Sequence, residues 1–346
     1  MRVVLLGPYP PPHGGVQTNL TAIRAYLLER GEECAVINLH RFRSGRGEAV
    51  FHPESALEAL WLLARLRADV IHLHIGGDLT PRLLGLCLVC CAMPGRKAVL
   101  TFHSGGYPSS EAGRRAAPFS LRGFVFRRFE RIIAVNLEIA EMFARFGVAP
   151  ERVRTIAPHA LPPAQPHTEM PAPLREFFGA HSPVLLSVGL LEPEYDLPLQ
   201  IEALGAIRAR FPNAGLALIG AGSLEADLRR RIAEQPWAEH ILLCGDVPHP
   251  GTLAAIAAAD VLLRTTLYDG DSVSVREALH LGTPVVATDN GMRPAGVRLI
   301  SASNAAALCR AVADAVQAPR TRPAAKRDTG QENIEAVYKL YRELTR

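Results

Sequence analysis

Long apolar runs are missing from this chain of 346 residues. A membrane-spanning helix needs about 20 consecutive apolar residues, and the apolar stretch at residues 83–93 is far too short for one. The first apolar segment, residues 3–6, is likewise too short for the core of a signal peptide. These absences argue against a spanning protein. We therefore expect a cytoplasmic location, with peripheral contact at the inner face of the cell membrane left open.

A strong charge of either sign and a metal-binding cysteine pattern are also missing. The formal net charge is only +4, which is well short of the dense positive charge typical of nucleic-acid-binding proteins. Cys87 and Cys90 have metal-like spacing, but no second pair lies near them. We interpret the six cysteines as reduced and mostly buried thiols. The mild basicity suits an anionic substrate or an anionic membrane surface and predicts no nucleic-acid partner.

The sequence does contain a repeated alternation of short apolar runs and helical segments. In the first half, apolar runs rich in Val and Ile lie at residues 3–6, 35–39, 70–73, 98–102, 131–135 and 154–156. Segments with helical periodicity lie at residues 15–30, 55–67, 80–93 and 137–146. Short runs of this kind, followed by helices, are typical of buried parallel strands in β-α units.

A proline-rich stretch interrupts this pattern, with six prolines in residues 158–173. Proline suits neither a helix interior nor a central strand, so the stretch indicates a linker. The alternation then resumes, with apolar runs at residues 184–188, 215–219, 241–244, 261–264 and 285–288 and helical segments at 197–210, 223–234, 251–259, 273–281, 304–316 and 331–346. The sequence therefore predicts an α/β protein with two Rossmann-like, doubly wound parallel-sheet domains that face a cleft.

We place the domain boundaries by this pattern. The predicted parts are an N-terminal domain at 1–160, a linker at 161–180, a C-terminal domain at 181–330, and a final helix at 331–346 that packs back on the first domain. Ligands of such sheets bind at the carboxyl ends of the strands. The loops that follow the predicted strands therefore carry the functional argument.

A glycine turn follows the first predicted strand and precedes a helix. It contains His13, Gly14 and Gly15, and such a turn lets backbone amides approach a phosphate near the helix N-terminus. The spacing is not that of a dinucleotide fingerprint, and a simple chain reversal explains the glycines equally well. A role for His13 in ligand binding stays open.

Histidines mark two further strands of the first half. His103 ends the fourth apolar run, next to Gly105 and Gly106, where an imidazole can hydrogen-bond a sugar hydroxyl or a developing charge. Capping or packing is the alternative role for His103. His72 and His74 lie within a strand, and we interpret them as packing residues.

Glycine loops follow three strands of the second half, at Gly189, at Gly220 and Gly222, and at Gly245 before Asp246. Three such loops in one domain fit a nucleotide bound against the main chain. The most informative segment is 264–289, where Asp269 and Asp271 precede a helix that starts near Ser272, with Glu277 in its second turn. Carboxylates accept several hydrogen bonds from a hydroxyl-rich ligand, and the helix start suits phosphate. An N-capped helix with a solvated acid is the alternative.

With these motifs the chain resembles glycosyltransferase family 4, retaining enzymes with the GT-B architecture. The most specific part is Glu277-Ala-Leu-His-Leu-Gly-Thr-Pro, which is similar to the family's second motif glutamate and its Gly-Thr-Pro strand. Asp269 lies where the family has its first motif glutamate. The resemblance implies a nucleotide-sugar donor as substrate, no cofactor and no metal.

The resemblance also implies roles for individual residues. The catalytic residues would be His103, Asp269 and Glu277, with Glu277 on the ribose and His103 and Asp269 on the donor sugar. The donor and its nucleotide would further contact Gly14, Gly15, Gly189, Gly220, Gly222, Asp246, Val247, Arg264, Gly270, Asp271, Ser272, Val273, Ser274 and Arg276. The acceptor side would include His13, Gly105 and Gly106.

The chain departs from the family pattern in two places, at the two basic positions that follow Gly189 and at Asp269, which stands in place of a glutamate and is one methylene shorter. The family places an Arg just after the glycine that matches Gly189 and a Lys about five residues later, whereas this chain has Leu190 and Tyr195. Those cations neutralise the leaving diphosphate in the family, and losing one such charge costs a few kcal/mol. We hypothesise that Arg264 and Arg276 replace them.

A segment of arginines and aromatic residues suggests the acceptor. The segment contains Arg114, Arg115, Arg122, Arg127, Arg128 and Arg131 among Phe119, Leu121, Phe124, Phe126 and Phe129. A basic and aromatic helix suits an anionic membrane and a lipid-linked acceptor, and an ordinary amphipathic helix is the alternative.

Taken together, we predict a retaining transferase that moves a hexose-type sugar to a glycan or lipid-linked acceptor in exopolysaccharide, O-antigen or glycolipid biosynthesis. Two alternatives remain. The missing Arg and Lys would suit a catalytically inactive nucleotide-sugar-binding protein, and a sugar-nucleotide epimerase shares the same two-domain fold. Detection of transfer by the purified protein would separate the first prediction from both alternatives.

Overall fold

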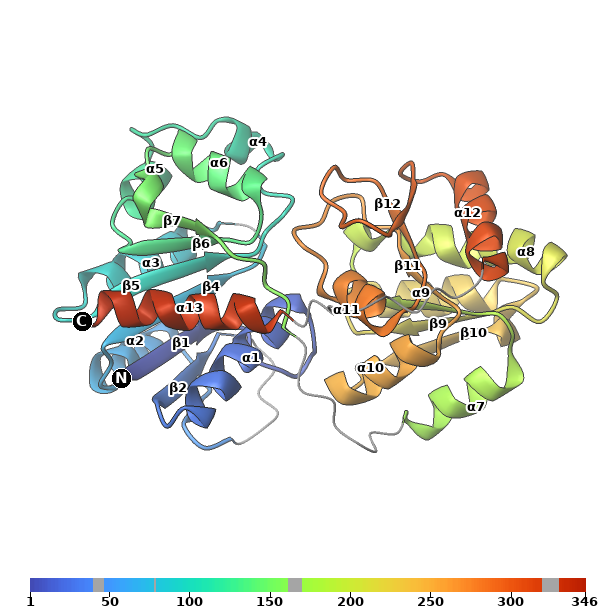
Figure 1. The fold of residues 1–346 in the computed structure, drawn as a ribbon, viewed down its shortest axis with the longest axis horizontal. Coiled ribbons are helices and arrows are strands. Elements are labelled where there is room, and N and C mark those ends of the chain that lie inside the picture. The colour runs from blue at the N-terminus through green and yellow to red at the C-terminus, as the bar shows by residue number, and fades with distance from the viewer. Residues whose placement is uncertain (40–46, 78, 161–169, 319–329) are drawn as a thin grey trace. The chain divides into compact units, whose positions relative to one another are not determined.

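The computed structural model describes residues 1–39, 47–77, 79–160, 170–318 and 330–346. They form two compact units, each built around its own parallel sheet (Figure 1). The first unit contains Met1–Pro11, Val16–Leu161 and Gly330–Arg346, and the second contains Pro12–Gly15 and Pro162–Thr329. Two parallel sheets of seven and six strands with covering helices confirm the predicted fold class.

The first unit has a seven-stranded sheet with the order β3-β2-β1-β4-β5-β6-β7, all parallel. The order reverses between β1 and β4, which is the switch point of a doubly wound sheet. Its strands are β1 (Arg2–Gly7), β2 (Glu33–Asn38), β3 (Val50–Phe51), β4 (Val70–Ile75), β5 (Lys97–Phe102), β6 (Arg131–Ala134) and β7 (Val153–Thr155). Its helices are α1 (Gly15–Glu29), α2 (Ala56–Arg65), α3 (Pro81–Ala92), α4 (Glu111–Arg114), α5 (Leu121–Phe126), α6 (Leu137–Arg145) and α13 (Gln331–Leu344).

Strand β4 shows why the first sheet is covered on both faces. Successive side chains of a strand point to opposite faces, so Ile71 and Leu73 join one apolar core with α3 and α6. Val70 faces the other core, which α1 and α13 cover. The C-terminal helix α13 buries Ile334, Val337, Leu340 and Tyr341, one stripe at helical spacing, and it crosses the sheet in Figure 1.

The second unit has a six-stranded sheet with the order β10-β9-β8-β11-β12-β13, again all parallel. Its strands are β8 (Val184–Val188), β9 (Gly215–Ile219), β10 (Ile241–Gly245), β11 (Val261–Arg264), β12 (Val285–Thr288) and β13 (Arg298–Ile300). Its helices are α7 (Ala172–Ala180), α8 (Leu197–Arg210), α9 (Glu225–Ala233), α10 (His249–Ala258), α11 (Val273–Leu281) and α12 (Ala305–Gln317). The strand order reverses between β8 and β11, so a ligand site is expected at their carboxyl ends.

The last part of the linker predicted over residues 161–180 is helical in the structure. Residues 161–169 lie outside the described residues, but Ala172–Ala180 forms helix α7. Its proline lies in the first turn, where the missing N–H has no helical partner to lose, so the helix tolerates it. Leu174 is fully buried against the second sheet, which makes α7 part of the second unit.

The basic and aromatic segment around residues 114–131 is not the single helix that we predicted. It contains two short helices, α4 and α5, separated by a turn. Phe126 and Phe129 are fully buried in the core, whereas Phe119 in the turn is fully exposed. Pro118 lies in that turn, and the residue before a proline is disfavoured in a helix, which helps to explain the break.

The described residues contain neither a disulfide nor a helix able to cross a membrane. All six cysteines are free, and Cys34, Cys87 and Cys90 are buried. Burial raises the pKa of the Cys90 thiol to about 12, which keeps it protonated and unreactive at neutral pH. Within the described ranges, every helix is too short or too polar to span a bilayer.

Candidate functional site

The segment that carries most of the predicted site joins β11 to α11 in the second unit. β11 lies beside β8, where the strand order reverses, so this loop starts at the switch point of the sheet. Helix α11 begins at Val273 with no acidic residue in its first turn, and the Ser272 side chain makes no capping bond. The N–H groups of a first helical turn have no partner within the helix and carry partial positive charge. The local structure therefore offers an anion-binding helix end.

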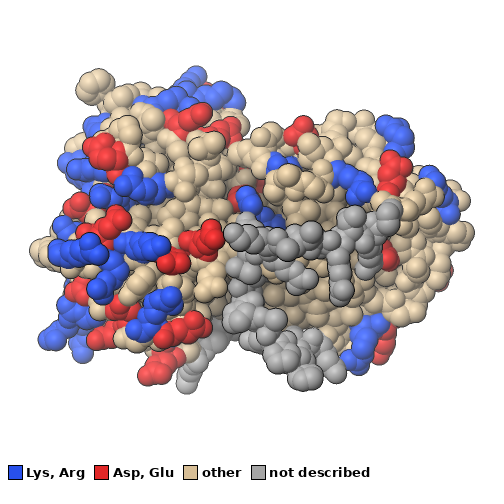
Figure 2. All heavy atoms as spheres, in the orientation of Figure 1, with Lys and Arg blue, Asp and Glu red and all other residues tan. Residues whose placement is uncertain are grey.

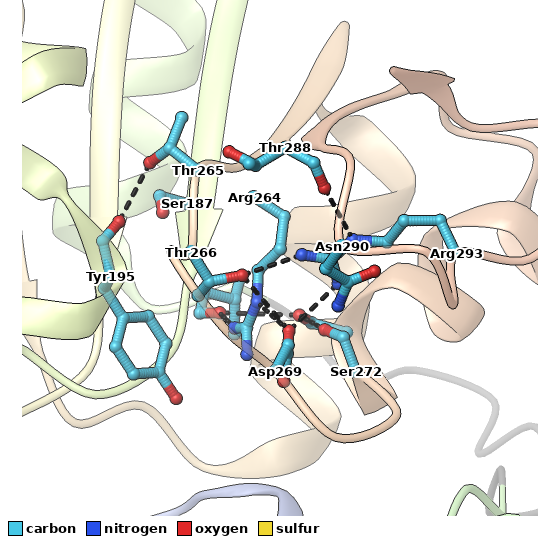
Figure 3. Close-up of polar contacts among 12 residues, drawn as sticks. Ser187, Tyr195, Arg264, Thr265, Thr266, Asp269, Ser272, Thr288, Asn290 and Arg293 are labelled. Atoms are coloured by element: carbon cyan, nitrogen blue, oxygen red, sulfur yellow. Dashed lines mark hydrogen bonds and ion pairs between the residues drawn. The ribbon is translucent and has the colours of Figure 1, made fainter. Parts of the chain in front are cut away.

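Two arginines hold one carboxylate just before this helix (Figure 3). Arg264 Nε donates to Asp269 Oδ2 over 2.9 Å, and Arg293 Nη1 donates to the same oxygen over 3.0 Å. Thr266 Oγ1 adds a third donor at 3.3 Å and itself accepts from Arg293 Nη2 at 2.7 Å. Arg293 Nε is bonded to the Thr288 carbonyl at 3.0 Å. The Asp269 side chain is thus fixed from two sides.

The cluster around Asp269 is buried and carries an excess of positive charge. The side chains of Arg264, Asp269 and Arg293 are only 9%, 12% and 3% exposed. Burial alone would raise the pKa of the Asp269 carboxyl, but the neighbouring charges of Arg264 and then Arg293 outweigh it and lower that pKa. Two guanidinium groups and one carboxylate leave a net charge of +1. Buried charge of one sign is costly unless an ion compensates it.

Tyr195, which stands where the family pattern has a Lys, supports Arg264 directly. The Arg264 guanidinium lies over the Tyr195 ring, 4.6 Å from its centroid, and Nη1 donates to the Val188 carbonyl over 3.0 Å. Thr265 Oγ1 donates to the Tyr195 carbonyl and accepts from Gln200 Nε2 at 2.8 Å. The Tyr195 ring therefore packs against the guanidinium of Arg264, the last residue of β11, and supports it by a cation–π contact.

Arg276, the second proposed replacement cation, has a different partner. Its Nε is bonded to both carboxylate oxygens of Asp271, at 2.7 and 2.8 Å. Asp271 is 7% exposed and Arg276 26% exposed at the side chain. The structure brings Arg276 together with Asp271 and leaves Arg264 with Asp269, so Arg276 is part of a neutral pair.

Glu277 is held by a histidine that the sequence did not single out. His249 Nε2 lies 2.6 Å from Glu277 Oε1, which joins the start of α10 to the second turn of α11. The Glu277 side chain is only 4% exposed. The carboxylate is therefore positioned by a bond on one oxygen, and within the described residues its other oxygen has no bonding partner that we identify.

The glycine loops of the second unit pack on one another. Gly220 has φ +143°, and a Cβ there would lie 1.7 Å from the Gly189 carbonyl oxygen. A Cβ at Gly222 would lie 2.5 Å from the Leu191 carbonyl oxygen. Close packing of backbones explains these glycines without a ligand, although the same loops end at the switch-point edge of the sheet. Their contact with a nucleotide stays a prediction.

The predicted base-binding residues lie in different environments. The Val247 side chain is 4% exposed and belongs to an apolar core, and contact of the Val247 loop with the base stays a prediction. Asp246 accepts from the backbone N–H of His13 at 2.8 Å, within the second unit, to which Pro12–Gly15 belongs. Gly15 starts α1 and is exposed.

In the first unit, His103 lies directly after β5. Its ring contacts that of His74, and the His74 ring contacts that of His72. Its backbone N–H donates to the Ile75 carbonyl over 2.7 Å, and its Nε2 lies 3.2 Å from His74 Nδ1. His103 is half-buried, and in the turn that follows it Gly105 is buried and Gly106 half-buried. Burial lowers the pKa of His103 to about 3, so its imidazole is neutral at physiological pH.

Sequence reasoning missed Arg293 and His249. Arg293 follows β12 in a glycine-containing loop after Asn290, and a basic residue after a strand end was the available signal. His249 is the first residue of α10, just past the glycine loop after β10. Their partners, Asp269 and Glu277, are 24 and 28 residues away along the chain, and no local pattern predicts such pairs.

The second unit thus combines a buried cationic cluster with a helix start at the switch point that has no side-chain cap, and both features suit a phosphorylated ligand. Comparison with known families specifies the class. Residues 13–159 match the model of Glycosyltransferase Family 4, and residues 182–318 match that of Glycosyl transferases group 1. These two matches span most of the chain. The chain belongs to the family-4, group-1 glycosyltransferases, and the family prediction is confirmed.

Individual relatives are distant. The chain is 26% identical over 242 residues to 2-deoxystreptamine glucosyltransferase of Streptomyces kanamyceticus, covering 66% of this chain and 62% of that protein. It is 24% identical over 312 residues to phosphatidyl-myo-inositol mannosyltransferase of Mycolicibacterium smegmatis, covering 84% and 76%. Among solved structures, Anabaena HepE in complex with UDP-glucose has a TM-score of 0.65 and 16% identity, covering 100% of this chain and 97% of that chain. The chain spans less than two thirds of the first relative's length, and the solved structure supports the fold.

Proposed function

We propose that this protein transfers a hexose-type sugar from a nucleoside-diphosphate sugar to a glycan or lipid-linked acceptor, with retention at the anomeric carbon. The observation that carries the proposal is the net positive charge of the Arg264, Asp269 and Arg293 cluster just before the start of α11, which has no side-chain cap. An anionic diphosphate would compensate that charge. The match to glycosyltransferase families along most of the chain supports the choice of sugar donor.

The donor diphosphate would bind at the start of α11. The backbone N–H groups of Val273 and Ser274 would contact its oxygens, and Arg264 would supply the charge that Leu190 and Tyr195 lack. Arg293 would keep Asp269 neutralised, so that Arg264 remains effectively cationic toward the ligand. Arg276 would contribute less to diphosphate binding, because Asp271 already neutralises it.

The remaining roles follow the family resemblance. Glu277 would bind the ribose, Asp271 and Gly270 the sugar hydroxyls, and His103 an oxygen of the donor sugar. The diphosphate would leave and accept the acceptor's proton on the same face of the sugar, so the enzyme would contribute positioning and electrostatics more than a strong base. We propose that this chemistry needs no metal and no cofactor.

For the acceptor, we propose contact between the first unit and an anionic bilayer. The turn before α5 exposes Phe119 completely, and Leu121 and Phe124 are 63% and 42% exposed. Exposed arginines flank them, and Figure 2 shows basic side chains gathered over the end of this unit that carries α4 and α5. Apolar side chains among cations suit insertion at an anionic membrane surface. The lipid-named M. smegmatis relative fits a lipid-linked acceptor.

A two-stage experiment tests this function. A thermal-shift screen against UDP-, GDP-, ADP- and CMP-sugars would first find the donor, since a ligand that binds the native state raises its melting temperature. The protein with that donor and a membrane extract should then release the nucleotide and form a labelled glycan or glycolipid. Donor binding without transfer to any acceptor would favour the inactive binding protein, and interconversion of the sugar nucleotide would favour the epimerase.

A further inference from the structure

His74 lies directly beneath His103 in the first unit. Nδ1 of His74 is 3.2 Å from Nε2 of His103, and the two rings are nearly parallel, with centroids 5.5 Å apart and planes 22° apart. On its other side His74 contacts the His72 ring, with centroids 4.1 Å apart. His72 is held in turn by Thr101 Oγ1 at 2.7 Å and by the Tyr341 hydroxyl of α13. The ring of His74 is therefore fixed from both sides.

All three imidazoles of this stack are neutral. Burial lowers the pKa of His72 and of His103 to about 3, and burial together with the neighbouring imidazoles lowers that of His74 well below its usual value. A neutral imidazole carries one proton, on Nδ1 or on Nε2. The contact between His74 and His103 must therefore have one ring as donor and the other as acceptor.

The surroundings of His74 distinguish the two arrangements. His74 is 2% exposed, and its Nε2 is buried with no hydrogen-bond partner among the described residues. If His103 donated, the proton of His74 would sit on that Nε2 as a buried N–H without an acceptor. Buried N–H groups without partners are rarer in folded proteins than acceptors without partners, and one costs about 1–3 kcal/mol. The arrangement in which His74 Nδ1–H donates leaves only a bare lone pair at Nε2.

We infer that His74 donates to His103 Nε2 and so fixes His103 in the tautomer whose proton is on Nδ1. His103 Nδ1 has no partner in the part of the chain that the structure describes, and His103 is half-buried rather than enclosed. His103 thus presents a hydrogen-bond donor to its ligand and has no lone pair available to act as a base. His74 is a positioning residue for this donor.

This inference deepens the proposed function, and its meaning for catalysis rests on that function. A neutral Nδ1–H donor suits an oxygen of the donor sugar. It also explains why the acceptor's proton would go to the leaving diphosphate, since Nε2 of His103 accepts from His74 and Nδ1 already carries a proton. The tautomer itself is a property of the free protein and can be measured whatever the protein binds.

Long-range proton–nitrogen correlation spectra of the full-length protein, labelled with nitrogen-15 in the histidine rings, test the inference. The His103 signals would be assigned by their loss in His103→Asn. We expect a protonated Nδ1 and an unprotonated Nε2 for His103, and the reverse pattern for its two nitrogens in the wild-type protein would overturn the inference. This measurement needs no variant of His74 and no substrate.

Two substitutions of His74 then separate positioning from packing. Asn places an amide N–H near the position of Nδ1, so His74→Asn should keep the His103 tautomer and most of kcat. His74→Phe fills the space without a donor, so His103 should shift toward the Nε2–H form and kcat should fall about tenfold with KM nearly unchanged, as expected for loss of one hydrogen bond in the transition state.

A matched control and a separate outcome for the function complete the test. Tyr341→Phe removes the hydroxyl at the far end of the stack and should leave the His103 tautomer unchanged. An unchanged tautomer in His74→Phe would contradict the inference even if sugar transfer is observed. If the wild-type protein shows the expected tautomer but transfers no sugar, the proposed function fails and the assignment of His74 stands.

Discussion

Arg264 Nε donates to Asp269 Oδ2 over 2.9 Å in a site where both side chains are almost completely buried. The pair joins the end of β11 to the loop before α11, five residues further on. Asp269 is the residue that replaces a glutamate of the family pattern, and its shorter side chain lies between two guanidinium groups (Figure 3). The replacement cation Arg264 and the shorter acid Asp269 are thus direct bonding partners.

The first prediction concerns the stability of this arrangement. Asp269→Asn removes the carboxylate that is paired with both Arg264 and Arg293 and leaves these two buried cations facing a neutral amide. Breaking a buried charge pair typically costs about 3–5 kcal/mol. We expect the free energy of unfolding, measured in urea, to fall by about 3 kcal/mol. In the matched variant Asp271→Asn the partner Arg276 is 26% exposed and can be hydrated, so the loss should be smaller. Equal losses would contradict the account of the cluster.

The second prediction concerns pH and the histidine stack. His72 and His74 are 0% and 2% exposed, and burial lowers both pKa values far below that of an unfolded histidine, about 6.5. Below pH 6.5 the unfolded chain therefore binds more protons than the native chain, and the free energy of unfolding falls as the pH falls. Each imidazole contributes about 1.4 kcal/mol per pH unit in that range.

Urea unfolding between pH 5 and pH 7.5 measures this slope, above the range in which carboxyl groups titrate. The asparagine in His72→Asn does not titrate in this range. The variant should therefore have a slope of unfolding free energy against pH that is smaller by the contribution of one proton. A slope that stays the same in His72→Asn would show that His72 is not a neutral, proton-excluding group in the native protein.

The third prediction concerns the exposed apolar surface of the first unit. The wild-type protein should co-sediment with vesicles that contain phosphatidylglycerol and not with vesicles of phosphatidylcholine alone, and added salt should weaken the binding. Phe119→Ser and Leu121→Ser should each weaken binding about tenfold, because each removes a side chain that would enter the interface. Leu57→Ser changes a leucine on α2 that is 79% exposed, against 63% for Leu121, and serves as the control. Loss of binding in Leu57→Ser to the same extent would argue against a defined surface at residues 119–124.

The sequence predicted the two sheets well because their central strands are buried on both faces. Such strands are mostly apolar runs rich in Val, Leu and Ile, and β8, β9, β11 and β12 have the predicted bounds. The short strands β3 and β13 were not predicted, since two or three residues at a sheet edge leave no run to detect. Helix α7 was missed because its prolines indicated a linker, although proline is tolerated in a first helical turn.

The site could be predicted from the sequence only where its residues are close to one another along the chain. The acidic loop and the helix with Glu277 follow one another in the sequence, so the segment 264–277 could be assigned as a unit. The partners that set its charges could not, because Arg293 and His249 come from other loops and meet the segment only in the folded sheet. His74 was interpreted as packing for the same reason, since its bond to His103 crosses from β4 to the end of β5.

The central claim is that Arg264 holds the donor diphosphate, and isothermal titration of nucleoside diphosphates measures it most directly. Arg264→Gln leaves Asp269 paired with Arg293, so the cluster becomes neutral while the fold keeps its ion pair. We predict at least a tenfold loss of affinity for the preferred nucleoside diphosphate, equivalent to about 1.4 kcal/mol, with binding of the bare nucleoside unchanged. Arg276→Gln should have a smaller effect. Unchanged diphosphate affinity in a folded Arg264→Gln protein would contradict the claim.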